Sequence, residues 1–299
     1  MQQTDRTTIF TQIARPGGGF AMVANDGRES FRGLLHRAGR PHEDHDLAAG
    51  KAQIARHLAP VASAMLCDTV YGREAISVIQ GLKDRGGLII AVDRFEEDWL
   101  GPLRATYIDV DAVSYAAQLE GVAALKHYVF WRADESAQAR RADVQAFIDA
   151  CAQLGVLSVL EGVVTTNPAD PLFDDHLVEA AREFGAFAPD VYKTQVPAQH
   201  HLDLARVAGE SARISDAVGV PWVALSNGVA AERFGEAIAA VCEGGASGFL
   251  AGRGAWKSAM QSGDPETALA TDAVAGLKQL AAIVDRHARP WHAVVPGAA

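Results

Sequence analysis

The sequence predicts an α/β fold built as a single (β/α)₈ barrel, and three observations support that prediction. Eight short apolar segments recur along the 299 residues, helix-length segments separate them, and a polar or charged residue stands at or near the end of each. The apolar segments are continuous rather than alternating, which is typical of parallel strands buried on both faces. We expect strands at 19–24, 63–67, 87–92, 127–131, 156–164, 190–194, 221–226 and 248–252.

Long segments between the strands have the length and pattern of helices, namely 136–155, 201–219 and 230–245. Eight strand–helix units in about 250 residues favour a closed TIM barrel over an open sheet. An open dinucleotide-binding sheet would carry a glycine-rich turn after the first strand, whereas the glycines at 17–19 come before it. We expect one domain over 1–299, with 1–15 and 289–299 as peripheral ends.

The charge balance and the N-terminus exclude several classes of protein. The chain has 27 Lys and Arg against 37 Asp and Glu, a net charge of −10, and nucleic-acid binding depends on neutralising phosphates. Charged residues interrupt every apolar run, so the sequence predicts no membrane span, which needs about 18 apolar residues. The first residues lack the apolar core of a signal peptide. We therefore expect a cytoplasmic protein, and a small anionic substrate stays open.

Neither the cysteines nor the histidines indicate a metal or redox site. Cys67, Cys151 and Cys242 are far apart and form no CxxC or CxxH pair, so we expect small buried hydrophobic residues. His200 and His201 are adjacent, and no helical HxxxH pattern accompanies them, which favours a polar loop over a metal site. We expect no cofactor.

Polar groups at the ends of the predicted strands mark the candidate site. In barrel enzymes the chemistry lies at the C-terminal ends of the strands. Here every predicted strand brings a polar or charged residue to that end, so we expect a functional site there. The residues are Asn25, Asp26, Gly27, Arg28, Asp68, Asp93, Arg94, Arg132, Asp134, Glu161, Lys193, Ser226, Asn227, Gly228, Gly252 and Arg253.

Lys193 is the most informative residue of this set. It lies in a short strand with apolar neighbours, and burial favours the neutral amine that attacks a ketone. Lys126 precedes the strand expected at 127–131 and would add a second cation if it points inward. Glu161 must be paired or must titrate, which suits a general acid or base. The alternatives are solvated lysines at both positions and a purely structural ion pair with Glu161.

The last two strands indicate an anion site. Ser226, Gly228, Gly252 and Arg253 offer backbone N–H groups and a guanidinium at the place where barrels usually bind phosphate. A rival hypothesis is a metal-dependent lyase, in which Asp68, Asp93 and Glu161 hold a magnesium ion. A barrel that binds a sugar phosphate as a sensor, without useful turnover, is the third hypothesis.

Several longer segments of the chain resemble one family. They are GFAM at 19–22, DGRE at 26–29, ASAMLCD at 62–68, LKHYVFWRADESAQAR at 125–140, VYK at 191–193, PWVALSNGV at 221–229 and GASGFLAGR at 245–253. In this order and spacing they resemble the class I tagatose-1,6-bisphosphate aldolases, and most closely the sulfofructose-phosphate aldolases. The resemblance covers nearly the whole chain.

The resemblance implies roles for individual residues. Lys193 matches the lysine that forms the Schiff base, Glu161 the acid/base glutamate, and Lys126 the cation beside it. Such enzymes need no metal, act on sugar phosphates and are commonly homo-oligomers. We expect Asp26, Arg28, Asp68 and Arg132 to bind the substrate, and Ser226, Gly228, Gly252 and Arg253 to bind the phosphate of its dihydroxyacetone phosphate half.

The chain departs from the family pattern at a few positions. Gly27 stands where the related enzymes have glutamine, and Gly162 stands where the sulfosugar relatives have proline. The loop at 165–171 lacks basic residues for a second anionic group. The sequence thus predicts a class I aldolase that cleaves a ketose of the tagatose-1,6-bisphosphate or 6-deoxy-6-sulfofructose-1-phosphate type to dihydroxyacetone phosphate and an aldehyde. The far end of the substrate stays open.

Overall fold

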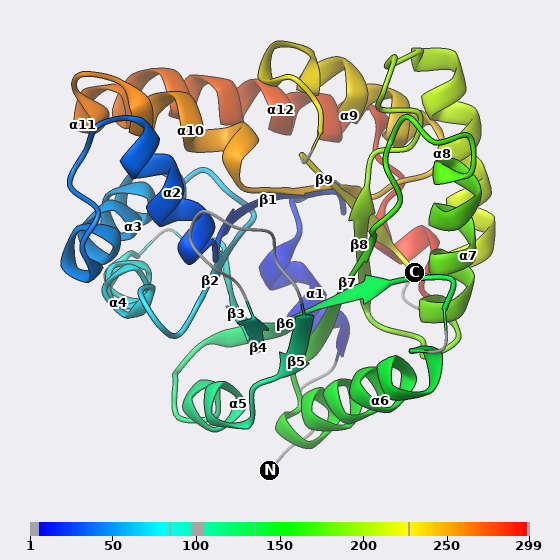
Figure 1. Cartoon of the computed structure of the whole chain (residues 1–299). Helices are drawn as coiled ribbons and strands as arrows, with labels where there is room; N and C mark the ends of the chain where they lie inside the picture. Colours follow the sequence, from blue (N-terminus) through cyan, green and yellow to red (C-terminus); the bar gives the residue numbers. More distant parts are fainter. Residues whose placement is uncertain (1–5, 84, 97–104, 135, 227, 298–299) are drawn as a thin grey trace.

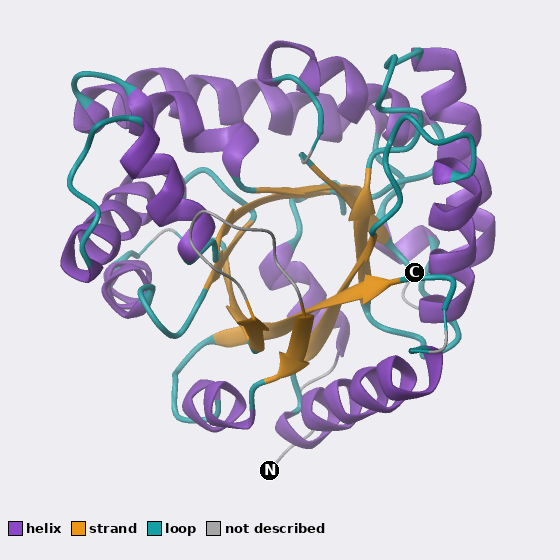
Figure 2. Ribbon diagram, viewed as in Figure 1, coloured by secondary structure: helices purple, strands orange, loops and turns teal. Residues whose placement is uncertain are grey.

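The computed structural model describes residues 6–83, 85–96, 105–134, 136–226 and 228–297 (Figure 1). Eight parallel strands close into a barrel with helices around it, so the predicted (β/α)₈ fold is confirmed (Figure 2). Neighbouring strands follow the order β1-β10-β9-β8-β7-β6-β3-β2. Their bounds are β1 Phe20–Asn25, β2 Ala64–Cys67, β3 Gly87–Ala91, β6 Val122–Trp131, β7 Leu157–Val164, β8 Val191–Gln195, β9 Trp222–Leu225 and β10 Gly248–Ala251.

Helix α8 begins and ends where local chemistry predicts. The Asp203 side chain accepts hydrogen bonds from the first backbone N–H groups of α8, and Gly219 ends this helix with a φ of +67°, which glycine adopts without strain. The bounds are α1 Arg6–Ile13, α2 Glu29–Arg37, α3 Asp44–Leu58, α4 Arg73–Gly81, α5 Val110–Ala116, α6 Ala137–Leu154, α7 Phe173–Gly185, α8 Leu204–Val218, α9 Phe234–Glu243, α10 Arg253–Gln261, α11 Pro265–Ala268 and α12 Val274–His287, with short turns η1 Ala231–Arg233, η2 Leu269–Ala273 and η3 Trp291–Ala293.

Two strand assignments differ from the sequence prediction. β6 begins at Val122 rather than at residue 127, because pairing with β3 and β7 on both sides makes a strand of a segment rich in helix-forming residues. The sequence analysis also missed a small antiparallel hairpin after β3, formed by β4 (Asp93–Glu96) and β5 (Ala105–Ile108). Its strands are short and only partly buried, and they lack the continuous apolar pattern of the barrel strands.

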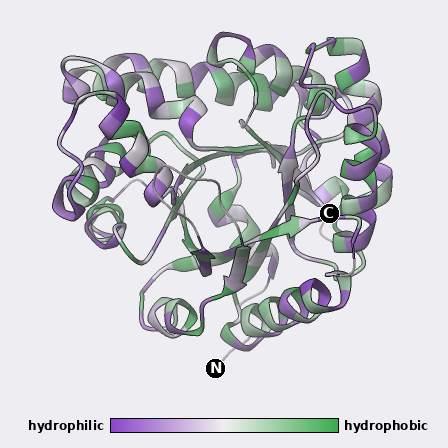
Figure 3. Cartoon of the chain, in the orientation of Figure 1, coloured by the Kyte–Doolittle hydropathy of each residue, from purple (hydrophilic) through white to green (hydrophobic). Residues whose placement is uncertain are grey.

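Alternate residues of the barrel strands face two different cores. Val159, Val191 and Val223 belong to a cluster inside the barrel, whereas Leu160 and Tyr192 pack outside it against the helices. Figure 3 shows the consequence, with hydrophobic strands in the barrel and helices of mixed hydropathy around it. This alternation fixes which residues can reach the interior, where the candidate site lies.

The N-terminal end of the barrel is closed by the two ends of the chain. Ile9, Phe10 and Ile13 of α1 belong to the inner core together with Trp291. The rings of Phe10 and Trp291 stack with centroids 4.5 Å apart and an angle of 7°. The expectation that 1–15 and 289–299 are peripheral therefore does not hold for these residues.

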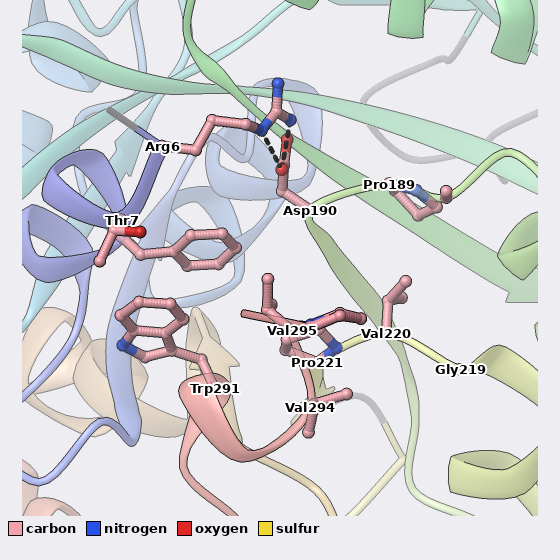
Figure 4. A pocket seen from close by; sticks show the side chains of 13 residues that line it. Arg6, Thr7, Pro189, Asp190, Gly219, Val220, Pro221, Trp291, Val294 and Val295 are labelled. Atoms are coloured by element: carbon pink, nitrogen blue, oxygen red, sulfur yellow. Dashed lines mark hydrogen bonds and ion pairs between the residues drawn. The ribbon is translucent and has the colours of Figure 1, made fainter. Parts of the chain in front are cut away.

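A cavity of about 170 Å³ lies beside this stack (Figure 4). Apolar residues, among them Val294 and Pro221, line most of it, and an ion pair between Arg6 and Asp190 stands at one side. Asp190 directly precedes β8, whereas Lys193 lies further along that strand towards its C-terminal end. The cavity is thus at the opposite end of the barrel from the candidate site.

One helical segment of the described chain, Pro265–Ala293, is long and apolar enough to cross a membrane by length and composition alone. The sequence analysis predicted no such segment, because it required an uninterrupted apolar run. In the fold α12 packs against β1 and α9 and buries Leu277, Ala281 and Val284. Its apolar face is therefore accounted for by packing onto the barrel.

Replacing Trp291 with Ala should lower the free energy of unfolding by about 3–5 kcal/mol, because the change removes the stack on Phe10 and leaves a cavity in the inner core. Urea denaturation would measure the loss. Leu172, which is 52% exposed, gives the control, since Leu172→Ala should change stability by no more than about 0.5 kcal/mol. Equal stability of the two variants would contradict a core role for the C-terminal segment.

Candidate active site

Lys193, Glu161 and Lys126 meet inside the C-terminal half of the barrel. The Cα of Glu161 pairs in register with that of Lys193 across β7 and β8. The Lys193 Nζ lies 3.0 Å from Glu161 Oε2, and the Lys126 Nζ lies 2.8 Å from the same oxygen. All three side chains are buried. The structure therefore brings together the three residues that the sequence analysis proposed as catalytic.

Lys126 lies inside β6, not before a strand as the sequence analysis assumed, and its side chain is 1% exposed. Its ammonium contacts Asp26 Oδ2 at 2.9 Å and Asp93 Oδ2 at 2.9 Å as well as Glu161. Burial lowers the pKa of Lys126, but these three carboxylates outweigh burial and raise the pKa well above its usual value. Lys126 is therefore a fixed positive charge, and the solvated helix-end alternative is wrong.

Asp26 stands directly after β1, and the pKa of its carboxyl is shifted in the opposite direction to that of Lys126. Burial raises the pKa of its carboxyl, but the ammonium groups of Lys126, Lys193 and Lys51 outweigh burial and lower the pKa below its usual range. The carboxyl is thus ionised across the neutral range. Its contact of 2.9 Å with the Lys126 Nζ, which also contacts Glu161, brings Asp26 next to the proposed catalytic residues.

Arg28 and Asp68 belong to the same network of ion pairs as Lys126. The Arg28 Nη2 lies 3.2 Å from Asp93 Oδ1, and its Nε lies 3.9 Å from Asp68 Oδ1. The Asp68 Oδ2 accepts a hydrogen bond of 2.6 Å from the Lys51 Nζ. Both acidic side chains are fully buried. Arg28 and Asp68 therefore contribute buried charges to the site.

Lys51 is a member of the network that the sequence analysis missed. It comes from α3, is 1% exposed, and also donates to the backbone oxygen of Asn25 at 2.7 Å. The available signal was its position between Leu47 and Ile54 on the buried face of that helix. Among the residues that the structure describes, the connected cations are Arg28, Lys51, Lys126 and Lys193, and the connected carboxylates are Asp26, Asp68, Asp93 and Glu161, four of each sign.

The carboxylates of the proposed metal site are each engaged by cations. Asp68 pairs with Lys51, Asp93 with Lys126 and Arg28, and Glu161 with both Lys126 and Lys193. Within the described residues, no group of three or more His, Cys, Asp or Glu is arranged to hold a metal ion. This arrangement favours lysine chemistry over the magnesium hypothesis. It also gives His200 and His201 no described metal partners.

The ends of β9 and β10 meet at the N-terminus of α10. The backbone N–H of Gly254 donates to Ser226 Oγ at 3.3 Å. Gly252 precedes the first turn of α10 and, as a glycine, has no side chain to cap it. Gly228 has a φ of +88°, and a side chain there would collide with Gln199. The backbone N–H groups of this turn, the Ser226 hydroxyl and the exposed Arg253 side chain suit an anion, while Asn227 lies outside the described residues.

Arg132 follows β6, and its guanidinium lies 5.0 Å from the centre of the Phe130 ring. Phe130 faces the interior in alternation with Val129, which belongs to the outer core. Arg132 therefore lies just beyond the C-terminal end of β6, beside a ring that faces the interior.

The close packing around position 162 explains why this residue is a glycine. A Cβ at this position would lie 2.5 Å from the Phe184 ring and 2.6 Å from the Tyr192 hydroxyl, both on the outer side of the barrel. The residue thus faces the helices rather than the substrate. Gly27 lies in the loop of Asp26 and Arg28, and a Cβ there would come within 2.9 Å of Ser30 Oγ.

Comparisons with known proteins find relatives that match most of the chain. The profile of the DeoC/LacD family aldolases matches residues 21–258. Tagatose 1,6-diphosphate aldolase 2 of Enterococcus faecalis is 24% identical, over 97% of this chain and 96% of its own length. Tagatose 1,6-diphosphate aldolase of Listeria monocytogenes is 25% identical, over 94% of this chain and 91% of its own length.

Solved structures share the fold. The fructose-bisphosphate aldolase from Plasmodium falciparum, solved with TRAP and a small-molecule inhibitor, aligns with a TM-score of 0.68 and 11% identity, over 98% of this chain and 95% of that chain. The fructose-bisphosphate aldolase from Slackia heliotrinireducens aligns with a TM-score of 0.58 and 16% identity, over 94% and 90%. At such identity the likeness shows the barrel fold alone.

Replacing Lys126 with Met removes the cation that three carboxylates share. In the wild type Asp26 loses its stabilising effect only as the pH falls below about 4, and Lys126 only as it rises above about 10. Between pH 5 and 8 both contributions are constant. In the variant, burial raises the pKa of a carboxyl that has lost its partner, so the folded state takes up a proton and regains stability as the pH falls.

We expect Lys126→Met to lower the free energy of unfolding by about 3–5 kcal/mol relative to wild type at pH 8, and by clearly less at pH 5. Urea denaturation at both pH values would measure the difference. Lys278→Met, at an exposed position of α12, should cost no more than about 0.5 kcal/mol at either pH. A loss at position 126 that is the same at both pH values would contradict the charge network.

Proposed function

The chain belongs to the DeoC/LacD family of aldolases, which are carbon–carbon lyases, and we propose that it is a class I aldolase that acts through a Schiff base on Lys193. The observation that carries the proposal is the distance of 3.0 Å between the Lys193 Nζ and Glu161 Oε2 inside the barrel. A buried amine with a carboxylate in reach of its proton is the pair of groups that carbinolamine chemistry needs.

The proposed reaction begins when the neutral Lys193 amine attacks the ketone carbon and the carbonyl oxygen takes up a proton. The carbinolamine then loses water and becomes a protonated iminium. The C4 hydroxyl loses its proton, its electrons form the aldehyde carbonyl, and the electrons of the C3–C4 bond pass into an enamine. Protonation at C3 and hydrolysis release dihydroxyacetone phosphate and restore the amine.

Glu161 is proposed to move the protons of these steps, directly or through water. It is within hydrogen-bond distance of Lys193, so it can accept the ammonium proton before attack and return it to the departing hydroxyl. Lys126 holds Glu161 in place and stays protonated throughout. Its ammonium group can also hold substrate hydroxyl oxygens.

The N-terminus of α10 is proposed to bind the phosphate on C1. Backbone N–H groups at Gly252, Arg253 and Gly254, the Ser226 hydroxyl and the Arg253 guanidinium are all suited to a dianion. Gly228 belongs to the adjacent loop, where its positive φ shapes the backbone. β8 with Lys193 neighbours β9 in the barrel, so a phosphate there would lie close to the ketone.

The substrate is proposed to be a ketose 1-phosphate, of the tagatose-1,6-bisphosphate or 6-deoxy-6-sulfofructose-1-phosphate type. The names of the relatives support the first type. Asp26, Arg28, Asp68 and Arg132 surround the interior on the remaining sides, and Arg132 is a candidate for the far anionic group. Because Gly162 faces outward, its difference from the sulfosugar enzymes concerns packing against Phe184 rather than the choice of substrate.

Two other features belong to the proposal. We propose a cytoplasmic protein, as its sequence indicates, and a homo-oligomer, as the resemblance implies; light scattering would compare its mass with the 31.7 kDa of one chain. A sensor without turnover is less favoured, because the amine, the carboxylate and the anion site are all present together. Negligible cleavage of every candidate ketose, despite binding, would support that alternative.

Lys193→Ala should abolish turnover while the fold remains intact, because no iminium can form. In the wild type, borohydride reduction in the presence of dihydroxyacetone phosphate should leave a stable adduct on the peptide that contains Lys193, detected by mass spectrometry. Lys278→Met should still form the adduct. Ligand binding without any adduct at Lys193, or turnover that a chelator inhibits, would move the metal-dependent hypothesis ahead.

Arg253→Ala should raise the apparent dissociation constant for dihydroxyacetone phosphate by about ten- to a hundredfold, since a charged hydrogen bond contributes about 1.5–3 kcal/mol. Binding of dihydroxyacetone, which lacks the phosphate, should not change. Arg286→Ala on α12, at the other end of the barrel helices, is the matched control. An equal effect of Arg253→Ala on both ligands would contradict the phosphate assignment.

A further inference from the structure

Tyr128 is a residue of the site to which the proposed mechanism gives no role. It lies on β6, two residues after Lys126. Ala124 of this strand belongs to the core inside the barrel, whereas Leu125 and Val129 belong to the core outside it. Side chains alternate along a strand, so Tyr128 enters the same interior as Lys126.

The strand register places Tyr128 in one layer with the catalytic pair. Its Cα pairs with that of Glu161, and the Cα of Glu161 pairs with that of Lys193. β6, β7 and β8 are neighbours in the barrel (Figure 1). Three consecutive strands thus present a phenol, a carboxylate and an amine side by side.

The Tyr128 ring is held by its surroundings. Phe95 and Phe130 contact it edge to face, with centroids 5.7 Å and 5.2 Å away. The Lys126 Nζ lies 5.3 Å from the centre of the ring, and the backbone N–H of Tyr128 donates to Asp93 Oδ2 at 3.1 Å. The direction of the hydroxyl is therefore fixed before any ligand binds.

The hydroxyl itself makes no hydrogen bond to the other residues that the structure describes, although the side chain is half-buried. Burial and the nearby Glu161 carboxylate raise the pKa of Tyr128 above its usual value. The phenol therefore keeps its proton through the neutral range. It is a hydrogen-bond donor rather than an acid that gives its proton away.

The order of the strands indicates which part of the substrate reaches this donor. In the barrel order β10-β9-β8-β7-β6, the anion site lies at β9 and β10, Lys193 on β8, Glu161 on β7 and Tyr128 on β6. A ketose with its C1 phosphate at the anion site and C2 on Lys193 continues along this order. Its C4 atom and the remaining carbons then lie towards β6.

We propose that Tyr128 is a further substrate-binding residue, whose hydroxyl donates a hydrogen bond to the oxygen on C4 of the ketose. This inference rests on the proposed Schiff base at Lys193. The C4 oxygen loses its proton as the C3–C4 bond breaks, and a bond to a donor strengthens while negative charge develops on that oxygen. Tyr128 thereby helps the cleavage step and not the formation of the Schiff base.

Tyr128→Phe is the decisive variant, because it keeps the ring and its contacts and removes only the hydroxyl. The matched control is Tyr192→Phe on β8, whose ring packs in the outer core, away from the substrate. Two reactions are compared in each protein: cleavage of tagatose 1,6-bisphosphate, and borohydride trapping of dihydroxyacetone phosphate, which has no C4, on Lys193.

We expect Tyr128→Phe to lower kcat/KM for cleavage by about ten- to a hundredfold, mainly through kcat, while trapping of dihydroxyacetone phosphate stays within about twofold of wild type. Tyr192→Phe should match wild type in both reactions. Unchanged cleavage in Tyr128→Phe would overturn the inference. An equal loss of trapping and cleavage would also overturn it, because the hydroxyl would then act on Lys193 or its half of the substrate.

The two proposals fail in different ways. A wild-type protein that forms no adduct with dihydroxyacetone phosphate refutes the Schiff base itself. A wild-type protein that forms the adduct, together with a Tyr128→Phe variant that cleaves normally, refutes only the contact at C4.

Discussion

The shared contact of Lys126 with Asp26, Asp93 and Glu161 is the interaction on which the rest of the site depends. Its ammonium lies within 2.9 Å of an oxygen of each carboxylate. These residues come from the segment after β1, the hairpin after β3 and the middle of β7, so one side chain ties distant parts of the barrel together. Without this charge, buried carboxylates would face one another at a cost of several kcal/mol.

The barrel interior is divided along its axis into two environments. The N-terminal half is apolar and is closed by Phe10 and Trp291, while the C-terminal half holds the network of balanced charges. The apolar half keeps water from reaching the charged residues through the N-terminal end of the barrel. Electrostatic interactions in the C-terminal half are stronger for that reason. Through this division Phe10 and Trp291 support the charged half of the barrel, although both lie at its opposite end.

The sequence predicted the parts of the protein that depend on local pattern. Continuous apolar strands and the polar residue after each of them were enough to propose the barrel, whose eight strands are confirmed, and to list Lys193, Glu161 and Lys126. It failed where tertiary pairing overrides local pattern, as at residues 122–126, which become strand between β3 and β7. Lys51 was missed because its partner Asp68 is distant in the sequence and only the fold brings them together.

The balance of charge also bears on the proposed chemistry. With Lys193 protonated, the described part of the network has four cations and four carboxylates. If the Lys193 proton passes to Glu161, three cations and three ionised carboxylates remain, and their net charge is still zero. When Glu161 returns that proton to the departing hydroxyl, the iminium on Lys193 replaces the lost ammonium. A buried site strongly resists net charge, so a carboxylate at 3.0 Å from the amine lets each intermediate form without creating one.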